Sequence, residues 1–526
     1  MNKRLLDDAN ARAVLVSVFA LLLWWVAIRP LWMQVRGYTM DDAFISFRYA
    51  QNLVSTGNLS WNPGEKVATE GYSSILWVLV LAAISWFSGH LVVVVRILDT
   101  ALVLATAVAV GSSTVRRPGG LVGAGLAVSC FVLNTDLVTA TVSGMETSLA
   151  IFLETLFFLM VIGRYQETEK GDEDYARQAL RISLLGSLAA LTRPEFNLAF
   201  AVTVATLLAL DKRWRKEWKG LLIPYVAIGA AYMAWRIQKY GFLLPLPYYI
   251  KVSGERLAGA NEIKAFIERI GPLLPWLPFA LLARRQRAGI IATGLGTGSL
   301  LLFFMHPAPI MDVSHRYVVP LYGALCALGG IGAAALAART VSRGLVTATL
   351  ILLATASAIG IQHLDDQSLS SELLTYAAGM NKAHIPLGKA LAALGPDHLM
   401  AVGDDGAIPY YSKWRAIDTY GLNDRAIALT RSKGGYAPAL VLARQPDLMI
   451  FLSSTCQGYH PPPAVAYERL LLSAAVQAGY RRAGAVEFAP TYYLLLYVRD
   501  DAFGSMIEAR LRQAGLLASC SLPNMR

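Results

Sequence analysis

Charged side chains are scarce in this chain: only 16% of its 526 residues are Asp, Glu, Lys or Arg. Soluble globular proteins carry about 25%. Hydrophobic residues make up 55%, and the mean hydropathy is +0.46. These values exclude an ordinary soluble protein and predict an integral membrane protein with a polar portion. The net charge of +11 is accounted for by basic cytoplasmic loops. Since the basic residues lie in short loops, we expect no nucleic-acid partner.

Cysteine is scarce too, and the sequence lacks the usual motifs for binding zinc or a dinucleotide. No Cys/His spacing resembles a zinc site, and "VGDDGAIP" (402–409) lacks the G-x-G-x-x-G pattern of a dinucleotide site. Of the four cysteines, Cys130 and Cys326 lie in apolar runs and are typical packing residues. Cys456 and Cys520 lie in the polar C-terminal third. They are either a disulfide, if that third is extracytoplasmic, or two unpaired thiols.

Long apolar runs dominate the first two thirds of the chain. A membrane-spanning helix needs about 20 mostly apolar residues. The first run follows Lys3 and Arg4 without a cleavage site, which indicates an uncleaved transmembrane helix. The predicted spans are 13–33, 91–111, 120–138, 146–163, 178–192, 195–210, 219–237, 270–284, 288–305, 317–337 and 343–361.

A shorter apolar segment, 73–88, either spans or lies at the interface. If it does not cross, nearly every basic loop shares the side of the N-terminus, as the positive-inside rule requires. We therefore predict about eleven transmembrane helices, an interfacial or re-entrant 73–88 segment, a cytoplasmic N-terminus and a periplasmic C-terminal domain. The basic loops in question are 116–117, 164–170, 211–219, 284–287 and 339–343.

The composition changes near residue 362. Residues 1–361 form the predicted membrane domain, with a first outer loop at 34–72, and residues 362–526 a small periplasmic α/β domain. In the second part, strands are expected at 398–404, 446–452 and 492–498, and helices at 437–445 and 464–479.

Two adjacent acids, Asp41 and Asp42, follow the first apolar run in "YTMDDAFISFRYAQNL" (38–53). One acid can cap the helix that starts there. Two adjacent carboxylates repel each other, so a cation, metal or basic partner is expected beside them. At a membrane boundary they can deprotonate a sugar hydroxyl or hold a divalent cation such as Mg²⁺ or Mn²⁺. No other cofactor is indicated.

Further polar residues fall on the same predicted outer face. Acids and aromatic residues of the first loop are suited to binding a sugar: Trp61, Glu70 and Tyr72. Basic residues of the outer turns can hold a phosphate if they converge, or extend to the lipid headgroups if they do not: Arg193, Lys251, His315 and Arg316. For Glu146 and Glu195 we expect pairing with these cations. Together these groups favour transfer of a sugar from a lipid phosphate to an outer acceptor.

The residues "DDAFISFRYAQNLVSTGNLSWNPGEKVATEGYSSILWVLVLA" (41–82) resemble the first outer loop of GT-C membrane glycosyltransferases, the mycobacterial terminal β-(1→2) arabinofuranosyltransferases and their bacterial homologues in particular. Similar landmarks are "SGMETSL" (143–149), "LAALTRPEF" (188–196), "YYIKVSG" (248–254), "HRYVVPLY" (315–322) and "GDDGAIPYYSKWRAIDTYGLND" (403–424). The resemblance implies a GT-C fold in a bacterial inner membrane, with a periplasmic active site.

It further implies a polyprenyl-phosphate-linked sugar donor, decaprenyl-phosphoryl arabinofuranose in the characterised relatives, and a glycan, glycolipid or glycoprotein acceptor. Asp41 becomes the expected general base, and Asp42 its partner in orienting the acceptor or binding a metal. Lys251, Arg193 and His315 with Arg316 become the expected phosphate ligands. A transporter or flippase of lipid-linked saccharides, or a non-catalytic envelope scaffold, is the alternative.

Overall fold

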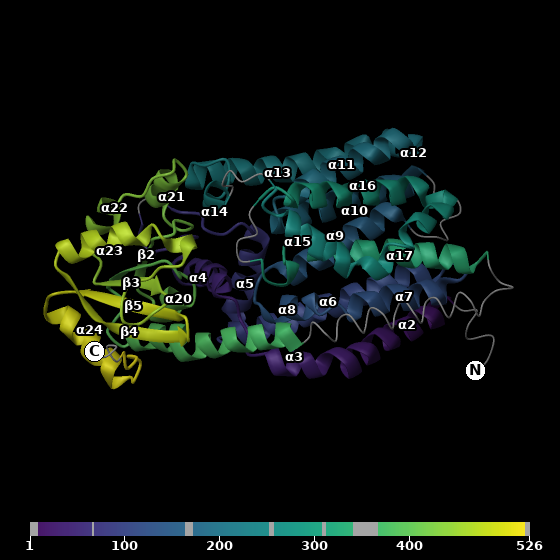
Figure 1. The fold of residues 1–526 in the computed structure, drawn as a ribbon. Coiled ribbons are helices and arrows are strands. Elements are labelled where there is room, and N and C mark those ends of the chain that lie inside the picture. The colour runs from purple at the N-terminus through teal and green to yellow at the C-terminus, as the bar shows by residue number, and fades with distance from the viewer. Residues whose placement is uncertain are drawn as a thin grey trace.

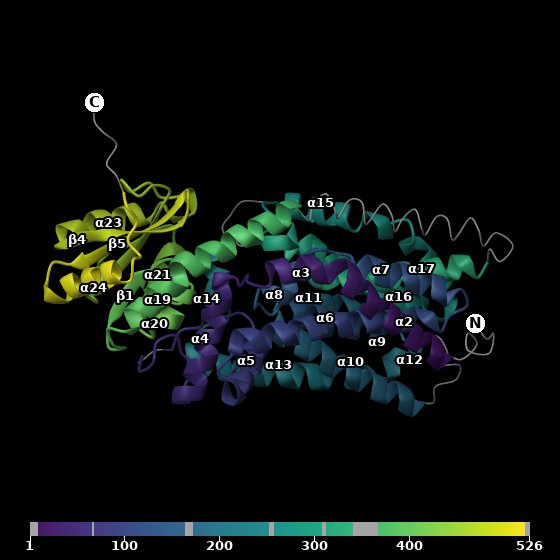
Figure 2. The same cartoon turned by 90° about the horizontal axis from the view of Figure 1, so that it is seen from below.

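The chain forms a long helical bundle with a small sheet-containing domain at one end (Figure 1). The structure, a computed structural model, describes residues 9–65, 68–163, 172–251, 257–307, 312–339 and 367–520. Both views place the start of α2 (Ala9–Leu23) and the short helix α12 (Lys212–Lys216) at the end of the bundle opposite to that domain (Figure 2). The predicted helical bundle with a small C-terminal α/β domain is confirmed. The predicted boundary near residue 362 and the span 343–361 lie outside the described residues.

The bundle is built from helices of very different length, most of them apolar. They are α2 (Ala9–Leu23), α3 (Arg29–Val35), α4 (Asp41–Thr56), α5 (Ile75–Phe87), α6 (Leu91–Val115), α7 (Gly120–Val132), α8 (Asp136–Val142), α9 (Thr147–Ile162), α10 (Asp172–Thr192), α11 (Phe196–Leu210), α12 (Lys212–Lys216), α13 (Trp218–Tyr240), α14 (Leu246–Lys251), α15 (Ala260–Arg269), α16 (Arg287–Phe304) and α17 (Tyr322–Ala337). A π-helical turn over Trp24–Ile28 joins α2 to α3.

Five helices of the described part are long and apolar enough to cross a membrane, or seven if each of two bent pairs counts as one span. The predicted span 120–138 is such a pair, α7 and α8, bent by 59°. The predicted span 270–284 is not a straight α-helix. It consists of 3-10 helices at Gly271–Leu273 and Leu277–Leu282, bent by 55° from α15. The prolines of "GPLLPWLP" (271–278) cause this, because each removes a backbone donor.

Helix α5 is the segment whose crossing the sequence left open. It begins after Ser74, whose hydroxyl accepts a hydrogen bond from the Trp77 backbone N–H. Its 13 residues rise about 20 Å at 1.5 Å each. That is shorter than the ~30 Å hydrocarbon core of a bilayer, as is also the case for α9 and α11, so the interfacial or re-entrant position of this segment stays a prediction.

The loops fall into two groups at opposite ends of the bundle. The basic loop before Gly119 lies against the end of α17, since a side chain at Gly119 would meet the Ala334 carbonyl. The Gln286 amide likewise donates to the Gly163 carbonyl, so the loops after α9 and before α16 share that end. The loops predicted to face outward gather at the other end, near the C-terminal domain. Which end is periplasmic stays a prediction from the charge pattern.

The C-terminal domain contains a five-stranded sheet of order β2-β1-β3-β5-β4. Strands β2 (Arg415–Asp418), β1 (Leu399–Val402) and β3 (Leu448–Ser453) are parallel, whereas β5 (Tyr492–Arg499) runs antiparallel to β3 and to β4 (Tyr480–Ala489). Helices at 367–379, α19 (Ile385–Ala392), α20 (Ala407–Ser412), α21 (Arg425–Arg431), α22 (Ala439–Leu442), α23 (Glu468–Gln477) and α24 (Ala502–Gln513) accompany it. The three expected strands are present; the sequence interpretation missed β2 and β4.

Helix α4 joins the two parts of the molecule. Its buried Arg48 donates to the carbonyls of Pro409 and Trp414 in the C-terminal domain and to Trp61 in the first loop. The first loop is equally close, because a side chain at Gly71 would overlap that of Asn423. The C-terminal domain is therefore docked tightly on the first loop, and this contact fixes how α4 presents its acids.

Candidate functional site

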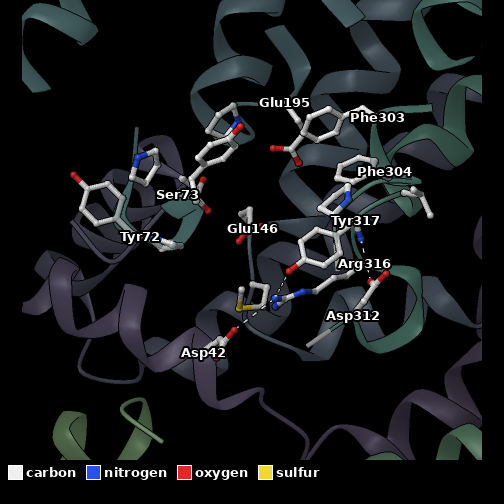
Figure 3. A pocket seen from close by; sticks show the side chains of 18 of the residues that line it. Asp42, Tyr72, Ser73, Glu146, Glu195, Phe303, Phe304, Asp312, Arg316 and Tyr317 are labelled. Atoms are coloured by element: carbon white, nitrogen blue, oxygen red, sulfur yellow. Dashed lines mark hydrogen bonds and ion pairs between the residues drawn. The ribbon is translucent and has the colours of Figure 1, made fainter. Parts of the chain in front are cut away.

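A cavity of about 590 Å³ opens at the end of the bundle that faces the C-terminal domain. Its residues come from α4, the first loop, the turn before α9, the turn before α11, α14, α15, the end of α16 and the segment before α17. The C-terminal domain contributes Leu422. Part of the described lining is apolar, with Phe303, Phe304 and Leu198 among its residues, and part carries carboxylates and the guanidinium of Arg316. The cavity thus collects segments that lie far apart in sequence and that the charge pattern predicts to face outward (Figure 3).

Asp42 and Arg316 face each other in this cavity, with 3.5 Å between Asp42 Oδ2 and Arg316 Nη2 (Figure 3). Arg316 also donates to the hydroxyl of Tyr317, at 3.1 Å, and its Nε has no hydrogen-bond partner in the described part of the chain. The arginine is nearly buried, at 7% exposure. A guanidinium beside a carboxylate in a cavity can bind a phosphate oxygen while the carboxylate acts as a base.

Asp41 points in another direction, into the C-terminal domain. Its carboxylate accepts hydrogen bonds from the backbone N–H groups of Gly406 (3.0 Å) and Ala407 (2.8 Å), and it lies 3.3 Å from His384 Nδ1. Asp41 thereby supplies the N-terminal cap that α20 lacks, rather than capping its own helix. It is not among the described residues that line the cavity.

The surroundings of Asp41 keep it ionised. Burial disfavours the charged form, but the hydrogen bond and charge of His384 and the two backbone donors outweigh it and lower the pKa of Asp41. Burial also disfavours the charged form of His384, yet Asp41 and Asp404 raise the pKa of His384 above its ordinary value. His384 Nε2 lies 3.6 Å from Asp404, whose other neighbour is the Tyr492 hydroxyl. These groups form an ionic contact between the two parts of the molecule.

Arg193 lies behind the cavity wall. Its guanidinium contacts Glu146, at 3.1 Å, and Glu195, at 3.5 Å, and donates to the Tyr317 carbonyl. Both glutamates line the cavity, while Arg193 itself is 3% exposed. The expected pairing of these glutamates with a cation is present, and its effect is to hold two carboxylates on the cavity wall (Figure 3).

Two further residues were predicted to bind the phosphate, His315 and Lys251. His315 lies 3.2 Å from Asp136 and is not a lining residue. The side chain of Lys251, at the end of α14, lies outside the described part.

Of the predicted sugar-binding residues, only Tyr72 lines the cavity; its hydroxyl lies 3.0 Å from that of Tyr240. Trp61 is buried between Arg48 and the carbonyl of Ala416. Glu70 is buried in an ion pair. Trp61 and Glu70 are therefore buried in contacts within the protein and are not among the residues that line the cavity.

A two-aspartate metal site is not formed, because Asp41 and Asp42 point into different environments. Among the residues that the structure describes, no three His, Cys, Asp or Glu side chains form a group that could hold a metal ion. The cavity also contains Asp312 and Glu262, which the sequence interpretation did not single out. In the sequence, the indication that they could belong to a site was their position in loops of the predicted outer face.

Comparison with solved structures shows that the chain has the fold of GT-C membrane glycosyltransferases. ArnT from Cupriavidus metallidurans matches with a TM-score of 0.59 in its complex with undecaprenyl phosphate and 0.58 in the apo state, at 11% and 12% identity. Each match covers 92% of this chain and 97% of ArnT. The archaeal oligosaccharyltransferase AglB from Archaeoglobus fulgidus, in complex with an inhibitory peptide and a dolichol-phosphate, matches with a TM-score of 0.55 and 11% identity over 95% of this chain and 77% of AglB.

Sequence comparisons add little to this. Residues 375–502 match a family model described as a domain of unknown function, DUF8728. This match falls within the C-terminal domain. No curated protein sequence matches the chain. At 11–12% identity the structural likeness establishes the fold, and the activity has to be argued from the cavity.

Proposed function

We propose that the chain is an inverting glycosyltransferase that moves a sugar from a polyprenyl phosphate to an acceptor hydroxyl in this cavity. The observation that carries the proposal is the pair Asp42–Arg316, 3.5 Å apart on a cavity of about 590 Å³ that also has an apolar wall. Two structures of the same fold, ArnT and AglB, hold undecaprenyl phosphate and dolichol-phosphate. A lipid phosphate with its sugar has the matching chemistry: apolar chain, anion and hydroxyls.

In this mechanism Asp42 is the general base, in place of Asp41. Its carboxylate takes the proton of the acceptor hydroxyl as the new glycosidic bond forms. Arg316 binds the phosphate of the donor and stabilises the charge that develops on it as the glycosyl–phosphate bond breaks. Asp41 cannot serve without giving up its bonds to α20 and His384. Its role is to hold α4, and so Asp42, in place.

The charges of the cavity determine how the donor is oriented in it. A phosphate is repelled by Glu146 and Glu195 and attracted by Arg316, so it occupies the Arg316 side. The sugar then faces Glu146 and Glu195, which Arg193 holds fixed and which accept hydrogen bonds from hydroxyl groups. These two glutamates take the sugar-binding role that the sequence gave to Trp61 and Glu70.

For the donor sugar we propose arabinofuranose, on the resemblance of residues 41–82. For the acceptor we propose a cell-envelope glycan, glycolipid or glycoprotein, reached from the periplasmic face.

The test uses purified protein, decaprenyl-phosphoryl arabinofuranose and an arabinan acceptor. We expect transfer, lowered about 100- to 10,000-fold in kcat by Asp42→Asn, the range for loss of a general base. Glu268→Gln, which removes an exposed carboxylate of α15, is the matched control and should leave the rate unchanged. Undiminished transfer by Asp42→Asn would refute the role of this residue. Transfer of only a hexose from the corresponding donor would retain the mechanism and reject the sugar.

Binding measurements separate the two ends of the donor. Arg316→Met should weaken binding of decaprenyl phosphate about 10- to 100-fold, because a hydrogen bond to a charged group is worth about 1.5–3 kcal/mol. Glu195→Gln should leave binding of decaprenyl phosphate unchanged and weaken binding of the sugar-bearing lipid. Equal effects of Glu195→Gln on both lipids would contradict the assignment of the glutamates to the sugar.

A further inference from the structure

Two cysteines far apart in sequence lie together in the C-terminal domain. Cys456 lies just after β3 and is 7% exposed, whereas Cys520 is partly exposed. Both belong to one apolar cluster on the sheet, where burial and the neighbouring Cys456 thiol raise the pKa of Cys520 to about 11. Because both thiols lie in one packed cluster, side-chain rotation is the kind of movement that would bring the sulfurs to the ~2 Å of a disulfide bond.

The backbone around both cysteines is fixed to the same edge strand, β4. The guanidinium of Arg482 in β4 donates to the carbonyl of Cys456. Three residues further along β4, the carbonyl of Ala485 accepts a 2.8 Å hydrogen bond from the Ala518 backbone N–H. Leu517 packs against Gly484 between these two points. Strand β4 therefore holds the backbone next to both cysteines, so their closeness is set by the sheet rather than by chance approach of two loops.

We propose that Cys456 and Cys520 form a disulfide that fastens the C-terminal segment to the loop after β3. The oxidant is the disulfide of a thiol–disulfide oxidoreductase, as is usual in extracytoplasmic compartments. The more exposed Cys520 attacks that disulfide as a thiolate and forms a mixed disulfide, releasing one oxidoreductase thiol. The Cys456 thiolate then attacks the Cys520 sulfur and releases the second thiol. Two protons and two electrons pass from the cysteines to the oxidoreductase, which is left reduced.

The bond would protect the open edge of the sheet. Strand β4 is the last strand of the order β2-β1-β3-β5-β4, and the segment around Ala518 covers it. Uncovered edge strands pair readily with other chains. A disulfide that closes the stretch from 456 to 520 keeps this cover in place, and it restrains the unfolded domain as well. This inference does not depend on the glycosyltransferase activity.

The test is peptide mapping of the full-length protein from its native membrane, with thiols blocked by iodoacetamide at lysis in SDS. Without reductant we expect the tryptic peptides 445–469 and 513–526 to be joined, and Cys130 and Cys326 to be alkylated. After reduction all four cysteines should be alkylated. Cys456→Ser should leave Cys520 alkylated without reductant.

Each outcome decides the proposal. Alkylation of both Cys456 and Cys520 without reductant would overturn it, as would joining of either one to another cysteine. If Cys456→Ser fails to accumulate, Cys520→Ser offers the same comparison with Cys456 as the residue that becomes alkylated. Thermal unfolding of the wild-type protein adds a second measurement, since a reducing agent should lower its transition temperature and leave that of Cys520→Ser unchanged.

Discussion

The two adjacent aspartates should differ sharply when each is replaced by asparagine. Asp41 accepts two backbone hydrogen bonds from α20 and pairs with His384, all within the docked interface. Removing one partner of a buried ion pair costs about 3–5 kcal/mol. At about 1.4 kcal/mol per tenfold change in an equilibrium constant, Asp41→Asn should open the contact about 100- to 4,000-fold more often.

Hydrogen exchange measures this opening directly. The backbone amides of Gly406 and Ala407 are the donors to Asp41, so their exchange rates report whether the contact is closed. We expect both amides to exchange faster in Asp41→Asn by the factor given above, and amides in the centre of β3 to be unaffected. Transfer activity should fall as well, because α4 then no longer holds Asp42 in place.

Asp42→Asn is the matched comparison, as the same change one residue further along the helix. It should leave the exchange of Gly406 and Ala407 unchanged and still abolish transfer. Unchanged exchange of these amides in Asp41→Asn would refute the docking role of Asp41. Wild-type exchange together with lost transfer in Asp41→Asn would instead restore Asp41 as the base.

Three further predictions concern the same interface and the first loop. Gly406→Ala should lower transfer and speed exchange at α20, because a Cβ there would lie 2.1 Å from the Asp41 carbonyl oxygen; wild-type behaviour would contradict it. The contact should also depend on pH. The stabilisation that His384 gives to this contact is complete below the ordinary pKa of 6.5 and is lost as the pH rises through the raised pKa of His384. The stabilisation that Asp41 gives is lost as the pH falls through the lowered pKa of Asp41. Exchange of α20, corrected for intrinsic rates, should therefore increase on the alkaline side, and His384→Gln should remove that increase; a flat profile in the wild type would argue against it. Arg236→Met should lower the free energy of unfolding by about 3–5 kcal/mol, because it leaves buried Glu70 without the partner that lies 2.7 Å away. Adding Glu70→Gln should recover part of the loss in a thermal unfolding measurement, and no recovery would indicate that packing rather than charge is at stake.

Much of the bundle was accessible to sequence reasoning because long apolar runs have few alternatives to a helix in a membrane. The predicted span 270–284 is not a regular helix, and its sequence contains the reason: three prolines in 271–278 break it into 3-10 turns. Strand β4 was missed because two arginines and one glycine interrupt its alternation, which an edge strand tolerates. Strand β2 is only four residues long.

The sequence by itself determined that this is a membrane chain, that its informative polar residues lie in loops of one predicted face, and that an acid pair follows the first span. It could not decide which acid faces the cavity. Consecutive residues of a helix point about 100° apart, so the direction of each depends on what the helix packs against. Here that partner is α20, whose amides bind Asp41 from 365 positions away and so turn Asp42 toward Arg316. Only the tertiary structure brings these segments together, because the hydrogen bonds that orient α4 come from a domain that local sequence pattern cannot place.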